Sequence, residues 1–114
     1  MLLWWRRRRW HPVARVGELK PGQVIAVTVA GIDMVLGLDG DRYFAVQRRC
    51  VHRGADLAGA FIAKNQLVCP QHGWRFSTAD GRGGALPDAC LQMYGVRVVG
   101  DQIEIEPTPK KRPR

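Results

Sequence analysis

Two short segments of this sequence each carry one cysteine and one histidine, and this pairing limits the possible folds more than any other feature. The segments read C-V-H (residues 50–52) and C-P-Q-H (residues 69–72), and sixteen residues lie between them. Two thiolates and two imidazoles on two loops make a four-ligand set for a metal centre. We therefore expect both segments to meet around one metal site. The four expected ligands are Cys50, His52, Cys69 and His72.

Two kinds of metal centre take two cysteines and two histidines. Zinc binds them tetrahedrally in structural sites, and a [2Fe–2S] cluster can take both thiolates on one iron and both imidazoles on the other. In zinc fingers the cysteines usually pair with each other, and so do the histidines. Here each segment supplies one of each, which favours the two-iron cluster because each loop must then reach both irons. A zinc-stabilised binding module remains the alternative.

The two segments lie in a loop-rich region, about residues 48–87, which we take as the cluster-binding subdomain. Its many glycines leave little regular structure, and a bound metal centre would supply the missing cross-link. The sequence on both sides is β-rich and shows no convincing helical period. We expect strands over residues 24–29, 32–38, 42–46, 94–99 and 102–105, with turn signals at residues 39–41 and 100–101. The expected fold class is all-β.

The net charge of +8 is unevenly distributed along the chain. Eight of the 18 basic residues lie in residues 6–9 and 110–114, whereas residues 10–109 hold ten basic and ten acidic residues. We therefore expect one neutral domain, residues 10–107, between two basic tails, residues 1–9 and 108–114. Neither a helix-turn-helix nor an RNA-binding aromatic motif accompanies the tails, which argues against a nucleic-acid-binding protein.

The sequence also bears on the cellular compartment. No apolar run approaches the roughly 18 residues that a membrane-spanning helix needs. The first nine residues run from apolar to basic, which is the reverse of a secretory signal. Three cysteines, two of them in metal-ligand spacing, argue against a disulfide framework and favour a reducing compartment. We expect a cytoplasmic protein without a transmembrane segment.

The two segments and their flanks resemble the Rieske [2Fe–2S] family. The stretches C-V-H-R-G-A from Cys50 and C-P-Q-H-G-W-R-F from Cys69 are similar to the Rieske domains of ring-hydroxylating oxygenases, and so is W-H-P-V-A from Trp10. The resemblance covers about residues 10–107. It implies stacked antiparallel sheets with the cluster-binding subdomain at one end. It also implies one [2Fe–2S] cluster per chain and a function in one-electron transfer.

The oxygenases of this family also carry a catalytic domain, whose mononuclear iron is held by two histidines and a carboxylate. This chain has three histidines, and with two assigned to the cluster only His11 is left. We therefore expect a ferredoxin-like electron carrier that is not an enzyme by itself, placed between a reductase and an oxygenase catalytic component. A Rieske subunit or detached domain of a ring-hydroxylating oxygenase is the alternative.

High-potential members of the family carry an additional cysteine in each loop, and hydroxyl groups that donate hydrogen bonds to the cluster and a ligand sulfur. Here Ala55 and Gln71 stand at the two cysteine positions, and Trp74 and Phe76 stand at the serine and tyrosine positions. The absence of these O–H donors implies a reduction potential toward the lower end of the Rieske range of about −150 to +300 mV.

Several other residues have expected roles outside the ligand set. We expect Cys90 to be a packed or loop thiol, His11 a surface or strand-start residue, and Trp74 a packing residue beneath a cluster loop. Residues 81–87 resemble the family's loop that covers the cluster. A basic rim near the cluster would attract an acidic partner, with ordinary solvation as the alternative. Its residues are Arg48, Arg49, Arg53, Arg75 and Arg82.

Overall fold

The computed structural model describes residues 9–51, 54–71, 73–83 and 89–110. Within these ranges the chain forms strands and one short 3-10 helix, and no described helix is long and apolar enough to cross a membrane. The elements are β1 (His11–Arg15), β2 (Val24–Val29), β3 (Ile32–Asp39), β4 (Arg42–Gln47), η2 (Leu57–Gly59), β5 (Phe61–Ala63), β6 (Gln66–Val68), β7 (Arg75–Ser77), β8 (Met93–Val99) and β9 (Gln102–Pro109).

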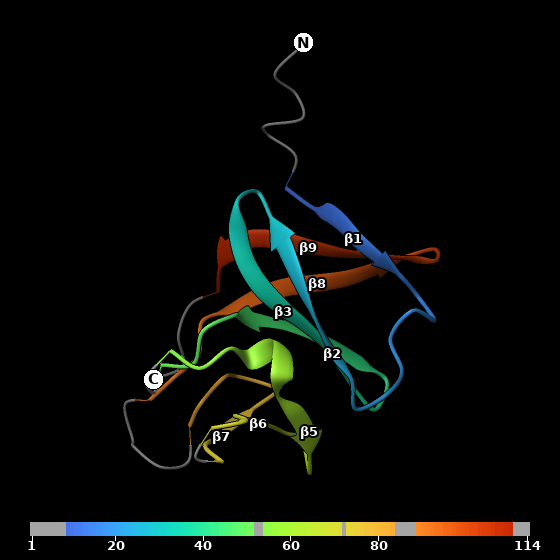
Figure 1. Cartoon of the computed structure of the whole chain (residues 1–114). Coiled ribbons are helices and arrows are strands. Elements are labelled where there is room, and N and C mark those ends of the chain that lie inside the picture. The colour runs from blue at the N-terminus through green and yellow to red at the C-terminus, as the bar shows by residue number, and fades with distance from the viewer. Residues whose placement is uncertain (1–8, 52–53, 72, 84–88, 111–114) are drawn as a thin grey trace.

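The strands form two antiparallel sheets. The larger has the order β1-β9-β8-β4-β3-β2, and the smaller has the order β5-β6-β7. The edge strands β1 and β2 of the larger sheet also contact each other, so that sheet curls back on itself. Figure 1 shows the small sheet and η2 lying below the large sheet. The expected all-β fold with a separate loop-rich layer at one end is therefore confirmed.

The five predicted strands are present, with bounds that differ by at most one residue except at the end of β9. Strand β9 continues to Pro109, although prolines are excluded from the centre of a sheet. Strand β1 pairs with β9 over residues 102–105, and beyond that point no described strand pairs with β9 on that side. A register shift between Tyr94 and Gly95 absorbs the additional residues. Prolines are tolerated at such edges and bulges.

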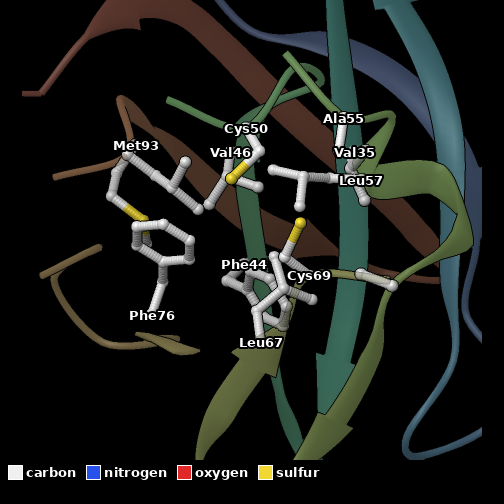
Figure 2. Packing of buried hydrophobic residues seen from close by; sticks show 12 residues of the cluster. Val35, Phe44, Val46, Cys50, Ala55, Leu57, Leu67, Cys69, Phe76 and Met93 are labelled. Carbon is white, nitrogen blue, oxygen red and sulfur yellow. The ribbon is translucent and has the colours of Figure 1, made fainter. Parts of the chain in front are cut away.

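Strand β3 is buried on both faces, and this arrangement divides the core in two. Side chains on opposite faces alternate along a strand, so Met34 and Leu36 enter one apolar cluster with residues of β8 and β9. Val35 enters a second cluster, which also contains Phe44 and Val46 of β4. This second cluster lies against the small sheet, and Figure 2 shows its packing. The β3–β4 hairpin therefore contributes side chains to both apolar clusters.

A buried threonine joins the small sheet to the tip of the β3–β4 hairpin. The Thr78 hydroxyl donates to Asp39 Oδ2 at 2.5 Å and accepts from Arg42 Nη2 at 2.7 Å. The Thr78 amide also donates to the carbonyl of Asn65, in the β5–β6 turn, at 3.1 Å. Because Thr78 is fully buried, these hydrogen bonds form away from water, where an unsatisfied polar group would be costly.

Candidate metal centre

The two predicted cysteine ligands lie in the core between the two sheets. Cys50 follows β4 in the chain and Cys69 directly follows β6, so the ends of two strands from different sheets position them. Only 3% of Cys50 and 1% of Cys69 is exposed, and both belong to the same apolar cluster. Figure 2 shows the two side chains extending toward one another from separate loops. All three cysteines of the chain are thiols, and none is in a disulfide.

The two loops that begin at these cysteines are closed by equivalent backbone contacts. The Cys50 amide donates to the carbonyl of Ala55 at 2.8 Å, and the Cys69 amide donates to the carbonyl of Trp74 at 2.7 Å. Both bonds join a cysteine to the fifth residue after it. The residues that flank each hydrogen-bonded pair are also paired. Arg49 pairs with Asp56 in the first loop, and Val68 pairs with Arg75 in the second. The two halves of the site therefore share one backbone plan.

Each loop turns at a glycine in the same position, four residues after its cysteine. Gly54 has φ of 67° and Gly73 has φ of 66°. Residues with a Cβ rarely adopt this left-handed conformation, which explains why glycine follows the histidine segment in both loops. In the first loop the Gly54 amide also donates to the carbonyl of Cys50 at 3.0 Å.

An ion pair closes the base of the first loop. Arg48 Nε and Nη2 donate to Asp56 Oδ1 and Oδ2, each at 3.0 Å. Asp56 also accepts from the amide of Ala58, so its carboxylate caps η2, whose Leu57 is fully buried. The Arg48 hydrogen bond, followed by the one from Ala58, lowers the pKa of Asp56 from 3.8 to about 2. The same pairing raises the pKa of Arg48.

Glutamine side chains join the same loop to β8. Gln47 Nε2 donates to the carbonyl of Arg49 at 2.6 Å, and Gln47 Oε1 accepts from the amide of Gln92 at 2.7 Å. Gln92 Nε2 in turn donates to the carbonyl of Met93 at 2.9 Å. These contacts hold the residue before Cys50 against the large sheet, so the first loop is anchored on both sides of its base.

Aromatic side chains line the second loop. Trp74 is half-buried against the apolar cluster that contains both cysteines, and Phe76 is fully buried within that cluster. The two ring centroids lie 6.4 Å apart at an interplanar angle of 38°. Trp74 thus packs where we expected it to, beside the loop that begins at Cys69. Neither ring carries a hydroxyl group that could donate a hydrogen bond to a ligand sulfur.

Several predicted residues lie outside the described part of the chain. His52, Arg53 and His72 are among them, as are residues 84–87 of the predicted covering loop. Among the described residues no group of three or more His, Cys, Asp and Glu side chains could hold a metal ion. The structure therefore brings Cys50 and Cys69 into one core and leaves the histidine half of the predicted ligand set untested.

The remaining thiol and the remaining histidine lie apart from this core cluster. Cys90 is half-buried and pairs with Arg82 near the base of the segment 84–88. Its Sγ lies 3.8 Å from the carbonyl of Asp80, and it is not a member of the cluster that holds the other two cysteines. His11 is the first residue of β1 and pairs with Ile105 of β9, so it starts a strand as expected.

The described residues fit a sulfur-ligated centre. Two buried thiols face one another from loops of the same plan, in a polypeptide whose sequence places a histidine within three residues of each. Thiolates are strong ligands for iron, and a low-exposure setting controls the potential of an iron–sulfur cluster. The family model of the Rieske [2Fe–2S] domain matches residues 9–105. The chain belongs to the Rieske [2Fe–2S] domain family.

The relatives fall into two groups, one of proteins much longer than this chain and one of proteins of similar length. Methylxanthine N1-demethylase NdmA of Pseudomonas putida is 39% identical over 77 residues, 63% of this chain and 22% of the demethylase. The ferredoxin component of the naphthalene 1,2-dioxygenase system of Pseudomonas aeruginosa is 26% identical over 99 residues, 86% of this chain and 95% of that ferredoxin. The solved ferredoxin of carbazole 1,9a-dioxygenase from Nocardioides aromaticivorans IC177 is 31% identical, with a TM-score of 0.81, and the match covers 89% of this chain and 100% of that one.

The chain spans 20 to 25% of the demethylase and oxygenase relatives that it matches, but nearly the whole of the naphthalene and carbazole dioxygenase ferredoxins. These findings confirm the predicted Rieske family and the [2Fe–2S] cofactor. They favour the cluster over the zinc-stabilised module that the sequence left open. A [2Fe–2S] cluster supplies one-electron redox chemistry when bound.

Sequence reasoning did not find the residues that hold the loops in place. The Arg48–Asp56 ion pair, the Gln47 contacts and the Thr78 hydrogen bonds all join residues that carry no motif. Apart from the contact between Gln47 and Arg49, their partners are eight to 45 positions away in the chain. The repeated spacing from cysteine to glycine was visible in both segments, and it could have predicted that the loops share one plan.

Proposed function

We propose that Cys50, His52, Cys69 and His72 hold one [2Fe–2S] cluster. The two buried thiols at the ends of separate strands support the cysteine half of this set. The equivalent closure of both loops supports the histidine half indirectly, because each loop then carries a histidine two or three residues after its cysteine. We assign the thiolates to the inner iron and the neutral imidazoles to the outer iron, as in Rieske centres.

The proposed role is that of a carrier that passes single electrons to an oxygenase component. The observation that supports it is length: the chain covers 95% of the naphthalene 1,2-dioxygenase ferredoxin component and 100% of the carbazole 1,9a-dioxygenase ferredoxin. The electron donor would be a reductase and the compartment the cytoplasm. A ring-hydroxylating dioxygenase is the finer choice of oxygenase, because the two ferredoxins are named for dioxygenases.

A second candidate is a Rieske subunit or detached domain of an oxygenase. The demethylase relative, which is more than four times longer than the matched region, favours it through its higher identity of 39%. A stable one-to-one complex with a catalytic chain, isolated from the source cells, would support this second candidate. A transient complex that dissociates on gel filtration would support the carrier.

Electron paramagnetic resonance of the dithionite-reduced protein tests the ligand set, with iron and sulfide assayed on the same samples. We expect Cys50→Ser, Cys69→Ser, His52→Ala and His72→Ala each to lose the Rieske signal. Two matched controls, Cys90→Ser and His11→Ala, should keep it. A signal that survives replacement of either histidine, or that is lost in Cys90→Ser, would contradict the assignment.

Redox titration tests the expected potential. Ala55, Gln71, Trp74 and Phe76 provide neither additional cysteines nor hydroxyl groups. We therefore expect a midpoint in the lower half of the range of about −150 to +300 mV that Rieske centres span. A midpoint in the upper half would show that other donors stabilise the reduced cluster.

A further inference from the structure

The formally neutral body of this protein is electrically polarised. Residues 48–90, which include the small sheet and both cysteine loops, contain six basic and three acidic residues. The remainder of the body, residues 10–47 and 91–109, contains four basic and seven acidic residues. The cluster-binding layer therefore carries a net positive charge, and the large sheet carries a net negative charge of the same size.

Two of the basic residues beside the cysteine loops are available to a partner, whereas Lys64, which is also exposed, lies between β5 and β6. Arg48 is held by Asp56, and Arg82 lies 3.8 Å from a carboxylate oxygen of Asp80. Arg49 and Arg75 are exposed, and neither forms a salt bridge with another described residue.

Both of these arginines lie at the bases of the cysteine loops. Arg49 directly precedes Cys50 and pairs with Asp56, whereas Arg75 is the first residue of β7 and pairs with Val68. Its neighbour Phe76 points into the core, so Arg75 lies on the opposite, solvent face. Each loop thus has an exposed guanidinium beside the strand pair that closes it.

The described residues at the loop tips are exposed and uncharged. Val51, directly after Cys50, leaves 45% of its surface open to solvent. Its counterparts in the second loop, Pro70 and Gln71, are exposed as well. An apolar or neutral centre beside arginines is the usual composition of a protein interface, in which arginine is enriched and other charges lie at the rim.

We propose that the cysteine-loop end is an electropositive docking face for an acidic surface of the redox partner, with Arg49 and Arg75 as its charged contacts and Val51 as an apolar one. The inference rests on the proposed function, because a face around the cluster matters only if electrons leave there. The polarised body turns this end toward an acidic partner during encounter, and such steering weakens with salt because the Debye length is about 8 Å at physiological ionic strength.

The test compares two double variants with the same net charge. Arg49→Glu with Arg75→Glu reverses the proposed face. Arg15→Glu with Lys20→Glu makes the same change of charge at exposed residues before β2, outside residues 48–90. Because both proteins keep identical basic tails, any difference between them reports where the charge lies rather than how much there is. A milder pair, Arg49→Gln with Arg75→Gln, covers the case in which charge reversal impairs folding.

Stopped-flow oxidation of the reduced proteins provides the first readout. The probes are hexacyanoferrate(III), which is anionic, and tris(phenanthroline)cobalt(III), which is cationic. At low ionic strength we expect the face variant to react about tenfold more slowly with the anionic oxidant and faster with the cationic one. The control variant should stay within about twofold of the parent protein for both. Equal rates in the two double variants would overturn the docking face.

Binding of poly-L-glutamate, measured by calorimetry, provides a second readout that does not need the cluster. We expect the face variant to bind this acidic probe more weakly than the control variant does, and equal binding would overturn the proposal. The Rieske electron paramagnetic resonance signal of each sample distinguishes failure of the docking face from failure of the proposed function. Equal rates with an intact signal refute the docking face alone, whereas a parent protein without the signal refutes the proposed function.

Discussion

The large sheet and the cluster-binding layer use the same antiparallel pairing but differ in what stabilises them. Strands β2, β3 and β4 are six to eight residues long, whereas β5, β6 and β7 have three residues each. The large sheet has an apolar cluster of its own, made with β8 and β9. The small layer buries its apolar side chains against Val35, Phe44 and Val46 of the large sheet. The small layer is therefore stabilised by packing on its neighbour, and we expect the cluster to add a cross-link between its loops.

Two matched leucines give the largest expected effect. Leu36 in β3 is fully buried in the cluster of the large sheet, and Leu67 in β6 is 1% exposed in the cluster beside the cysteines. Replacing either by alanine should lower the free energy of unfolding of the iron-loaded protein by about 2–5 kcal/mol, from lost burial and a residual cavity. Urea denaturation of the loaded and the iron-free proteins measures both changes.

Of the two losses in unfolding free energy, only that of Leu67→Ala is expected to depend on iron. Without iron the small layer lacks its cross-link, so Leu67→Ala should cost much less in the iron-free protein than in the loaded one. The cost of Leu36→Ala should be nearly the same in both states. If Leu67→Ala cost as much without iron as with it, the small layer would be stable by itself.

Two matched threonines probe the hydrogen bonds that join the two regions. Thr78 donates to Asp39 from a fully buried position, and Thr28 donates to Asp33 Oδ1 at 2.9 Å from an exposed one. Thr78→Val should lower the free energy of unfolding by about 1–3 kcal/mol, because it leaves the half-buried Asp39 carboxylate without its hydroxyl donor. Thr28→Val should cost under about 1 kcal/mol, since water replaces the hydroxyl. Equal costs in thermal unfolding would show that Thr78 does not join the sheets.

Acid provides the smallest and most local test. Because the pKa of Asp56 is lowered from 3.8 to about 2, its pair with Arg48 stabilises the first loop above pH 3.8, and this contribution is lost as the pH falls toward 2. In Arg48→Gln the carboxyl midpoint, measured by NMR titration, should return toward 3.8. That variant should also lose its visible iron–sulfur absorption at a higher pH than the parent protein. An unchanged midpoint would mean that Ala58, and not Arg48, sets this pKa.

The same two regions differ in how far the sequence predicts them. The strands of the large sheet were predicted because Val24–Val29 and the strands that follow are long, β-branched and separated by turn signals. Strands β5 to β7 were not predicted, since three residues are too few for an alternating pattern to stand out. The extent and pairing of β1 were not predicted, although a strand start was one of the two roles expected for His11. The partner strand β9 is almost ninety residues further along the chain, so no local turn signal indicates the pair.

The ligand set was predicted from residue types, and its geometry was not. Cysteine and histidine are rare enough that two spaced pairs indicate a metal centre, and the structure places Cys50 and Cys69 in one buried cluster. The equivalent closure of both loops depends on pairs such as Arg49 with Asp56, which form only when the chain is folded. The polarity of the body was missed for a different reason, because the charges of residues 10–109 were counted together and not separately for the two layers.

The hairpin of β3 and β4 has a consequence for the order in which the molecule opens. Its side chains fill two clusters at once, so neither region can come apart completely while Val35 and Leu36 stay in place. Backbone amides there should take up deuterium only when the whole domain opens, whereas amides of the short outer strands should label earlier through partial openings. The slowest signals in a labelling time course would then map a single ribbon, Ile32–Gln47, running between the redox end and the remainder of the protein.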